Sequence, residues 1–180
     1  TGVQPCALPI LRRLHSRQIA QEVLLRSVDF GILTFAPAEK ELQTIPLVTD
    51  ELVLLVRPND PLAKRKQITM EEMGRQTIIA HNDPSPARDR VLRLYEQRHT
   101  QLNIRLSLPS LDGIKRAVEM GLGVALLPRR CAMAEISRGH LAAVLVPALR
   151  SPRQVRFVYR TDTELSLAAK AFLETVRRLT

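Results

Sequence analysis

Two serines, Ser16 and Ser110, are the residues of this 180-residue sequence whose type and position best suit ligand binding. Each is predicted to lie between a strand and the start of a helix. There the hydroxyl group, the unpaired backbone N–H groups and the positive end of the helix favour an anion. The simpler interpretation is that each serine only caps its helix, which stabilises a protein by about 1 kcal/mol. His81, in a polar segment after a predicted strand, is a weaker candidate for the same ligand, and an exposed turn histidine is the alternative.

The motifs of the common enzyme classes are absent from the sequence. It contains no G-x-S-x-G nucleophile elbow and no phosphate-binding loop. Gly121-Leu122-Gly123 is not a dinucleotide fingerprint, because Leu126 replaces the third glycine and the segment precedes a predicted strand. No metal-ligand spacing links the histidines and cysteines, which are His15, His81, His99, His140, Cys6 and Cys131. We therefore expect no enzyme activity, no cofactor, no metal site and two reduced thiols.

The composition favours an anionic partner. There are 27 Lys and Arg residues against 18 Asp and Glu, a formal net charge of +9. A uniformly basic, solvated surface would give the same charge. Four phenylalanines, two tyrosines and no tryptophan offer little platform for base stacking. The one dense basic cluster, at 64–66, follows a turn and is predicted to be a solvated loop, and no segment has the pattern of a helix-turn-helix.

The chain has no apolar run long enough to span a bilayer and does not begin with a signal-peptide pattern. These features predict a cytoplasmic protein with no membrane partner.

Short apolar strands alternate with amphipathic helices, which favours parallel sheets with helices on both faces. Strands are predicted at 10–14, 28–33, 45–48, 51–57, 77–80, 103–108, 123–127, 141–146 and 154–159. Helices are predicted from Ser16 to Arg26, in a short turn capped by Thr69, from Pro86 to about Arg98, from Ser110 to Gly121, and after Pro128. A last helix is predicted to bury Leu165, Ala168, Phe172, Val176 and Leu179. Gly121 is predicted to end its helix in a left-handed conformation.

Two proline-marked breaks, at 81–86 and 147–152, divide the chain. The final strand and helix are too small to fold alone, so we expect them to return to the first piece. This predicts one lobe of residues 10–80 and 150–180, a second lobe of residues 81–149, and a cleft between them. Residues 1–9 are predicted to be an unstructured or non-native end.

Several stretches, taken in order, resemble the effector-binding (substrate-binding) domain of LysR-type transcriptional regulators. The most specific are Ser110-Leu111 and the segment VEMGLGVALLP at 118–128. The others are VDFGI at 28–32, DPLA at 60–63, GHL at 139–141 and LSLAAKAFL at 165–173. The resemblance covers residues 10–180. It implies an α/β fold of two Rossmann-like lobes, like a type 2 periplasmic binding protein, with a small effector held between the lobes.

The resemblance also has implications for individual residues. Ser16 and Ser110 align with hydroxyl positions that contact the effector in this family, and Leu111 and His81 complete the set of effector-binding candidates. The family's winged helix-turn-helix, linker helix and first strand-helix pair have no counterpart in this sequence.

We therefore expect a sensor domain of a bacterial LysR-type regulator that closes on a small anionic metabolite. DNA binding and homo-oligomer formation would belong to the intact protein. The first alternative is a solute-binding protein of a transport system with the same fold, which the upstream coding sequence would distinguish. The second is a small α/β enzyme, which a turnover screen would detect.

Overall fold

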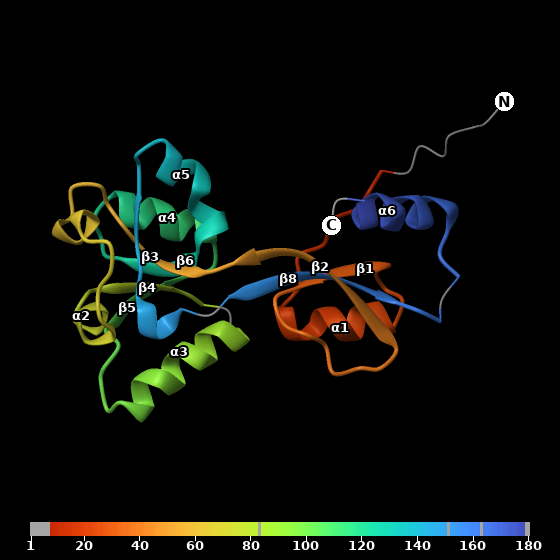
Figure 1. Cartoon of the computed structure of the whole chain (residues 1–180), viewed down its shortest axis with the longest axis horizontal. Helices are drawn as coiled ribbons and strands as arrows, with labels where there is room; N and C mark the ends of the chain where they lie inside the picture. Colours follow the sequence, from red (N-terminus) through yellow and green to blue (C-terminus); the bar gives the residue numbers. More distant parts are fainter. Residues whose placement is uncertain (1–7, 83, 151, 163, 179–180) are drawn as a thin grey trace. The chain divides into compact units, whose positions relative to one another are not determined.

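The computed structural model describes residues 8–82, 84–150, 152–162 and 164–178. The chain divides into two compact units (Figure 1). Unit 1 comprises Thr1–Thr49 and Arg153–Thr180, and unit 2 comprises Asp50–Pro152. The return of the chain to the first unit near residue 150 agrees with the sequence interpretation. The first boundary differs, because it lies at Asp50 rather than at residue 81. Most of the predicted end at 1–9 falls outside the described residues, and residues 8 and 9 have no regular structure.

Unit 1 is built on a three-stranded sheet in the order β1 (Phe30–Leu33), β8 (Arg153–Arg160) and β2 (Leu42–Asp50). β1 and β8 are antiparallel. Helix α1 (Ser16–Leu24) packs on one face, where Ala20 and Val23 are buried with Leu33 and Val158. Helix α6 (Leu167–Arg178) packs on the other face, on Phe157 and Tyr159. Successive side chains of β8 point to opposite faces of the sheet, so Val158 packs with α1 whereas Phe157 and Tyr159 pack with α6.

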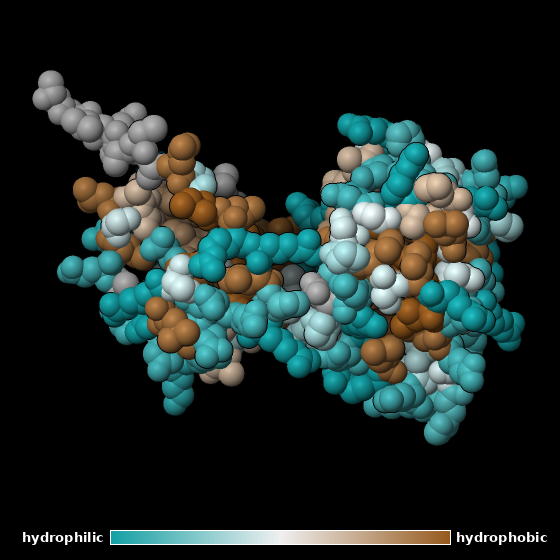
Figure 2. All heavy atoms as spheres, turned by 180° about the vertical axis from the view of Figure 1, so that it is seen from behind, coloured by the Kyte–Doolittle hydropathy of each residue, from teal (hydrophilic) through white to brown (hydrophobic). Residues whose placement is uncertain are grey.

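Three predictions for unit 1 are wrong in detail. Residues 10–14 form no strand. Ser16 is the first residue inside α1, so His15 rather than Ser16 is the N-cap. Phe172 is 47% exposed, while Ala169, Leu173 and Val176 are the buried residues of α6. Leu179 lies outside the described residues. Apolar side chains also gather on exposed parts of this unit (Figure 2). The large exposed apolar residues of unit 1 are Leu8, Ile10, Leu11, Leu25, Ile32, Leu167 and Phe172.

Unit 2 contains one antiparallel and one parallel set of strands. In the first, β3 (Leu52–Val56) lies between β6 (Ala125–Pro128) and β7 (Ala142–Val144), antiparallel to both. In the second, β4 (Ile78–His81) is parallel to β5 (Ile104–Leu108). A parallel bridge between Ile78 and Val124 connects β4 to β6. The expectation of parallel sheets is therefore wrong for β1 and β8 in unit 1, and in unit 2 it is wrong for β3, which is antiparallel to both of its neighbours.

Helices cover both faces of the unit 2 sheet, as the alternation of elements predicted (Figure 1). Leu54 and Val56 point toward α2 (Met70–Gly74) and α3 (Pro86–Gln97). The intervening residues Val53 and Leu55 point toward α4 (Leu111–Glu119) and α5 (Met133–Ser137). All four of these β3 side chains are completely buried. The remaining short helices are η1 (Pro61–Lys64), η2 (Arg129–Ala132) and η3 (Pro147–Leu149).

The predicted helix ends in unit 2 are confirmed. Thr69 and Glu72 form a reciprocal capping box at the start of α2. Helix α4 ends in a Schellman motif, in which the Gly121 N–H donates to Val118 and the Leu122 N–H donates to Ala117. Gly121 has φ +78°, as predicted. No helix among the described residues is both long and apolar enough to cross a membrane.

Candidate functional site

Three strands of unit 2 end at one edge of the sheet. β4 and β5 are parallel, with a register shift between Ile78 and Ile79 and with His81 opposite Leu108 at their carboxyl ends. The parallel bridge gives β6 the same direction. Each strand is followed by a helical segment: α3 after β4, α4 after β5, and η2 after β6. Parallel strands place ligand sites beyond their carboxyl ends, where helices begin. We define the site edge as the ends of β4 and β5 together with the first turns of α3 and α4.

Ser110 lies at this edge, as the N-cap of α4. Its Oγ accepts a hydrogen bond from the Gly113 N–H at 3.4 Å, which is a long contact. Because this bond uses an oxygen lone pair, the hydroxyl proton remains available to donate to a ligand. Leu111, the next residue, is half-buried against the core under α4. Ser110 is therefore a polar group at the edge, whereas Leu111 contributes apolar packing.

His81 lies at the same edge, at the end of β4. It is half-buried, and its backbone carbonyl accepts a hydrogen bond from Arg88 Nη1. The Asn82 N–H donates to the Leu108 carbonyl at 3.0 Å, which joins the segments that follow β4 and β5. The structure thus brings His81 and Ser110 to one edge of unit 2.

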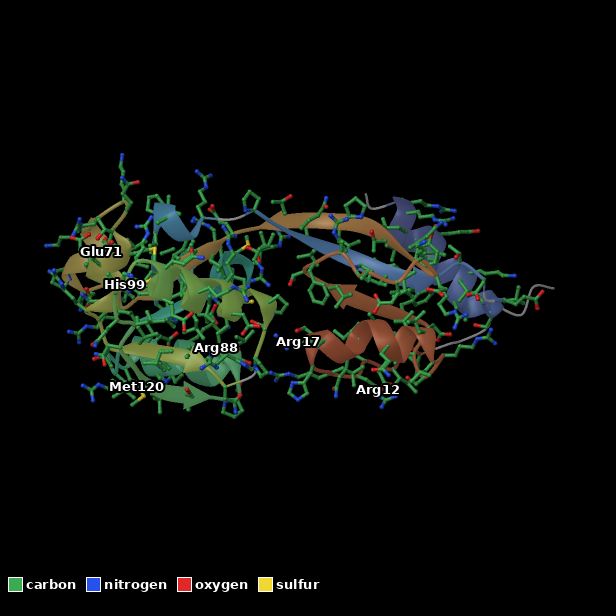
Figure 3. The ribbon with its side chains drawn as sticks, turned by 90° about the horizontal axis from the view of Figure 1, so that it is seen from below. Arg12, Arg17, Glu71, Arg88, His99 and Met120 are labelled. Carbon is green, nitrogen blue, oxygen red and sulfur yellow. The ribbon has the colours of Figure 1, made fainter. Side chains whose placement is uncertain are left out.

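The sequence interpretation missed two residues of this edge, Ser85 and Arg88. Ser85 is the N-cap of α3, and its Oγ accepts from the Arg88 N–H at 3.2 Å. Arg88, labelled in Figure 3, is half-buried in the first turn of the same helix. The sequence signal for this cap is a serine directly before Pro86, because proline suits the first position of a helix. The approach of the guanidinium group to His81 has no signal in the sequence.

One cation and two carboxylates lie beside the first turn of α4. Asp112 is 90% exposed and pairs with Lys115 at 3.0 Å, and Lys115 also pairs with Glu135 at 2.6 Å. The hydrogen bond to Glu135 raises the pKa of Lys115, and the same bond lowers the pKa of Glu135. Both groups are therefore charged near neutral pH, and Lys115 offsets one of the two negative charges beside the helix start.

Ser16 belongs to unit 1 and has a different environment. Its Oγ is buried and has no hydrogen-bond partner among the described residues. The N-cap of α1, His15, makes no side-chain capping bond. The adjacent chain is basic, with Arg12 and Arg17 labelled in Figure 3. A buried polar group without a partner costs about 1–3 kcal/mol, so the Ser16 hydroxyl is a candidate to bind a ligand atom.

Among the described residues, no group of three or more His, Cys, Asp and Glu side chains is placed to hold a metal ion.

A family model described as the LysR substrate binding domain matches residues 8–180. The chain belongs to this family. A similar curated relative is the uncharacterized HTH-type transcriptional regulator YeiE of Escherichia coli strain K12, 30% identical over 160 residues, which cover 89% of this chain and 54% of YeiE. Another is the HTH-type transcriptional activator CmpR of Synechocystis, 24% identical over 160 residues, which cover 89% of this chain and 53% of CmpR. This LysR-family chain thus spans about half the length of the curated relatives it matches.

Solved structures of the family share the fold. The CcmR regulatory domain of Synechocystis PCC6803 in complex with 2-PG has a TM-score of 0.79 at 24% identity, and the match covers 92% of this chain and 79% of that one. The effector-binding domain of QuiR in complex with shikimate has a TM-score of 0.74 at 20% identity, covering 91% and 77%. The chain has the periplasmic-binding-protein-like α/β fold of LysR regulatory domains, as predicted.

Proposed function

We propose that this chain is the effector-sensing part of a LysR-type DNA-binding transcriptional regulator, and that its effector is a small anionic metabolite. One observation carries the proposal beyond family membership. The N-termini of α3 and α4, each capped by a serine, follow two parallel strands that are paired in register at the site edge of unit 2. Two helix N-termini and the Arg88 guanidinium favour a carboxylate or phosphate group.

In this proposal Ser110 and Ser85 donate their hydroxyl protons to the anion. Arg88, already held by the His81 carbonyl, supplies positive charge, and Leu111 contributes apolar packing beside the site. We propose that the Ser16 hydroxyl of unit 1 is a further effector-binding group, because it is buried and has no partner among the described residues. An effector that binds one conformation of the chain more tightly than another shifts the population toward that conformation.

In this proposal the longer protein binds DNA through a helix-turn-helix outside this chain. Homo-oligomer formation is also assigned to the longer protein. The curated relatives support the regulatory role, because those cited above are transcriptional regulators rather than transport proteins or enzymes. The bound 2-PG of CcmR and shikimate of QuiR are acidic small molecules, which supports an anionic effector here.

The test is a thermal-shift screen of the purified chain against a library of anionic metabolites. A ligand at 100 times its dissociation constant stabilises the folded state by about 2.7 kcal/mol. Ser110→Ala and Ser85→Ala should each weaken the ligand about tenfold, through loss of one hydrogen bond of roughly 1–1.5 kcal/mol. Ser137→Ala is the matched control, because Ser137 Oγ donates to the Ala134 carbonyl on an exposed helix end of the same unit. A ligand whose affinity is unchanged by both site substitutions would refute this site.

A further inference from the structure

Lys115 connects three segments of unit 2. It lies one turn into α4, its side chain is only 12% exposed, and its Nζ donates to three oxygen atoms. These belong to Asp112 in the first turn of α4 (3.0 Å), to the Cys131 carbonyl in η2 (3.0 Å) and to Glu135 in α5 (2.6 Å). An ammonium group has three donors, so every donor of Lys115 has an acceptor. The lysine therefore holds η2 and α5 against the start of α4.

On its other side, η2 is held by the first residues of unit 2. The Arg129 N–H donates to the Glu51 carbonyl at 2.9 Å. The Arg130 N–H donates to Asp50 Oδ1 at 3.3 Å, and the same oxygen accepts the Glu51 N–H at 2.8 Å. The first amide of η2 is thus bound to Glu51 and the second to Asp50.

These two acidic residues lie where the chain passes between the units. The chain enters unit 2 at Asp50 and leaves it after Pro152. Glu51 Oε2 pairs with Arg150 Nε at 3.4 Å, and Arg150 is two residues before that exit. A continuous series of polar contacts therefore runs from the first turn of α4 through Lys115 and η2 to both passages of the chain.

We propose that Lys115 is a positioning residue that couples the anion site at the start of α4 to the two passages between the units. It holds η2 in the position where the Arg129 and Arg130 amides reach Glu51 and Asp50. The ligand end of this coupling rests on the proposed function. The contacts that lead from Lys115 through η2 to Asp50 are independent of any ligand. Hydrogen bonds and ion pairs that follow one another through a fold can carry coupling between two sites, and these contacts form such a network.

The first experiment measures amide hydrogen exchange by NMR in the ligand-free chain. In Lys115→Met we expect the Arg129, Arg130 and Glu51 amides to exchange about fivefold faster or more, because η2 loses its attachment to α4. Lys115→Arg, which keeps a cation beside Glu135 and Cys131, should restore most of the protection. The matched control is Arg116→Met on the same helix, which breaks an exposed pair with Glu119 at 2.9 Å and should leave these amides unchanged.

The second experiment adds inorganic phosphate at constant ionic strength, with chloride as the reference. In the wild-type chain, phosphate should shift the amide resonances of Leu111–Ile114 and also those of Asp50 and Glu51. In Lys115→Met it should still shift the first group but no longer the second. A variant that had merely lost stability would instead exchange faster throughout β3.

The possible results separate the two ideas. Unchanged exchange at Arg129 and Arg130 in Lys115→Met, or equal acceleration throughout β3 or in Arg116→Met, would overturn the positioning role. Equal phosphate responses of Asp50 and Glu51 in wild type and Lys115→Met would overturn the coupling. A wild-type chain in which phosphate shifts no α4 resonance would reject the anion site of the proposed function, and the exchange measurement would still decide the role of Lys115.

Discussion

Replacing Gly121 with alanine tests the reasoning about how α4 ends. Gly121 has φ +78°, a conformation that costs an L-residue about 1–2 kcal/mol. Alanine also restricts the unfolded chain, which returns about 0.4–1 kcal/mol to stability. A Cβ at this position would lie 2.9 Å from Arg57 Nη1, the far end of a flexible, exposed side chain that can move away. The net expectation for Gly121→Ala is a loss of about 1 kcal/mol.

Two other glycines of unit 2 supply the comparisons. Gly139 ends α5 in the same motif with φ +74°, and an added Cβ would meet nothing within 4 Å. Gly139→Ala therefore measures the conformational cost alone and should also lose about 1 kcal/mol. At Gly123, by contrast, a Cβ would lie 2.4 Å from the backbone oxygen of Thr77, which already accepts the Val124 N–H. Because that oxygen belongs to the backbone beside β4, Gly123→Ala should cost about 3 kcal/mol.

The assay is urea unfolding followed by circular dichroism, with the midpoint and the m value fitted for each variant. The expected order of destabilisation is Gly123→Ala well above Gly121→Ala, with Gly121→Ala and Gly139→Ala nearly equal. An unchanged or more stable Gly121→Ala protein would refute the assignment of a strained left-handed cap. A Gly121→Ala loss far above that of Gly139→Ala would show that the Arg57 side chain is fixed rather than adaptable.

Further outcomes are expected. Tyr95→Phe should lose about 1 kcal/mol in urea unfolding, because the Tyr95 hydroxyl donates to the buried Met70 carbonyl at 2.6 Å, and Val91→Ala is a control for packing on the same helix. Burial raises the pKa of Tyr95 to about 12, so ultraviolet titration should find it neutral at pH 10, and the stability it adds should fall as pH rises from about 10 to 12. The hydrogen bond from Lys115 lowers the pKa of Glu135 below 4.5. This pair should therefore stabilise the protein at neutral pH and lose its effect as pH falls through the lowered pKa. An NMR titration midpoint of Glu135 that does not rise in Lys115→Met would contradict this. The chain should show no sequence-selective DNA binding at physiological salt in a gel-shift assay, and any non-specific binding should weaken steeply as salt rises.

Local features of unit 2 could be predicted from the sequence because they depend on neighbours within a few residues. The Thr69 capping box, the Ser110 cap and the left-handed Gly121 each arise from hydrogen bonds between residues at most five positions apart. The family resemblance likewise rests on ordered local motifs, and it identified the fold. Ser16 was misjudged by one position because Ser and His are adjacent at the helix start, and only the actual backbone conformation decides which one is the cap.

The tertiary structure decided what depends on residues far apart in the sequence. β3 is apolar on both faces, so its pattern predicts a buried strand but neither its partners nor its antiparallel direction. For that reason the sequence predicts a domain boundary at the proline segment after His81, although this segment is a connection inside unit 2. The hydrogen bond from Arg88 to His81 and the contact of Lys115 with Cys131 also leave no periodic or spacing signal. Long, flexible cationic side chains can reach many acceptors, and only the packed positions of the helices determine which acceptor is within hydrogen-bonding distance.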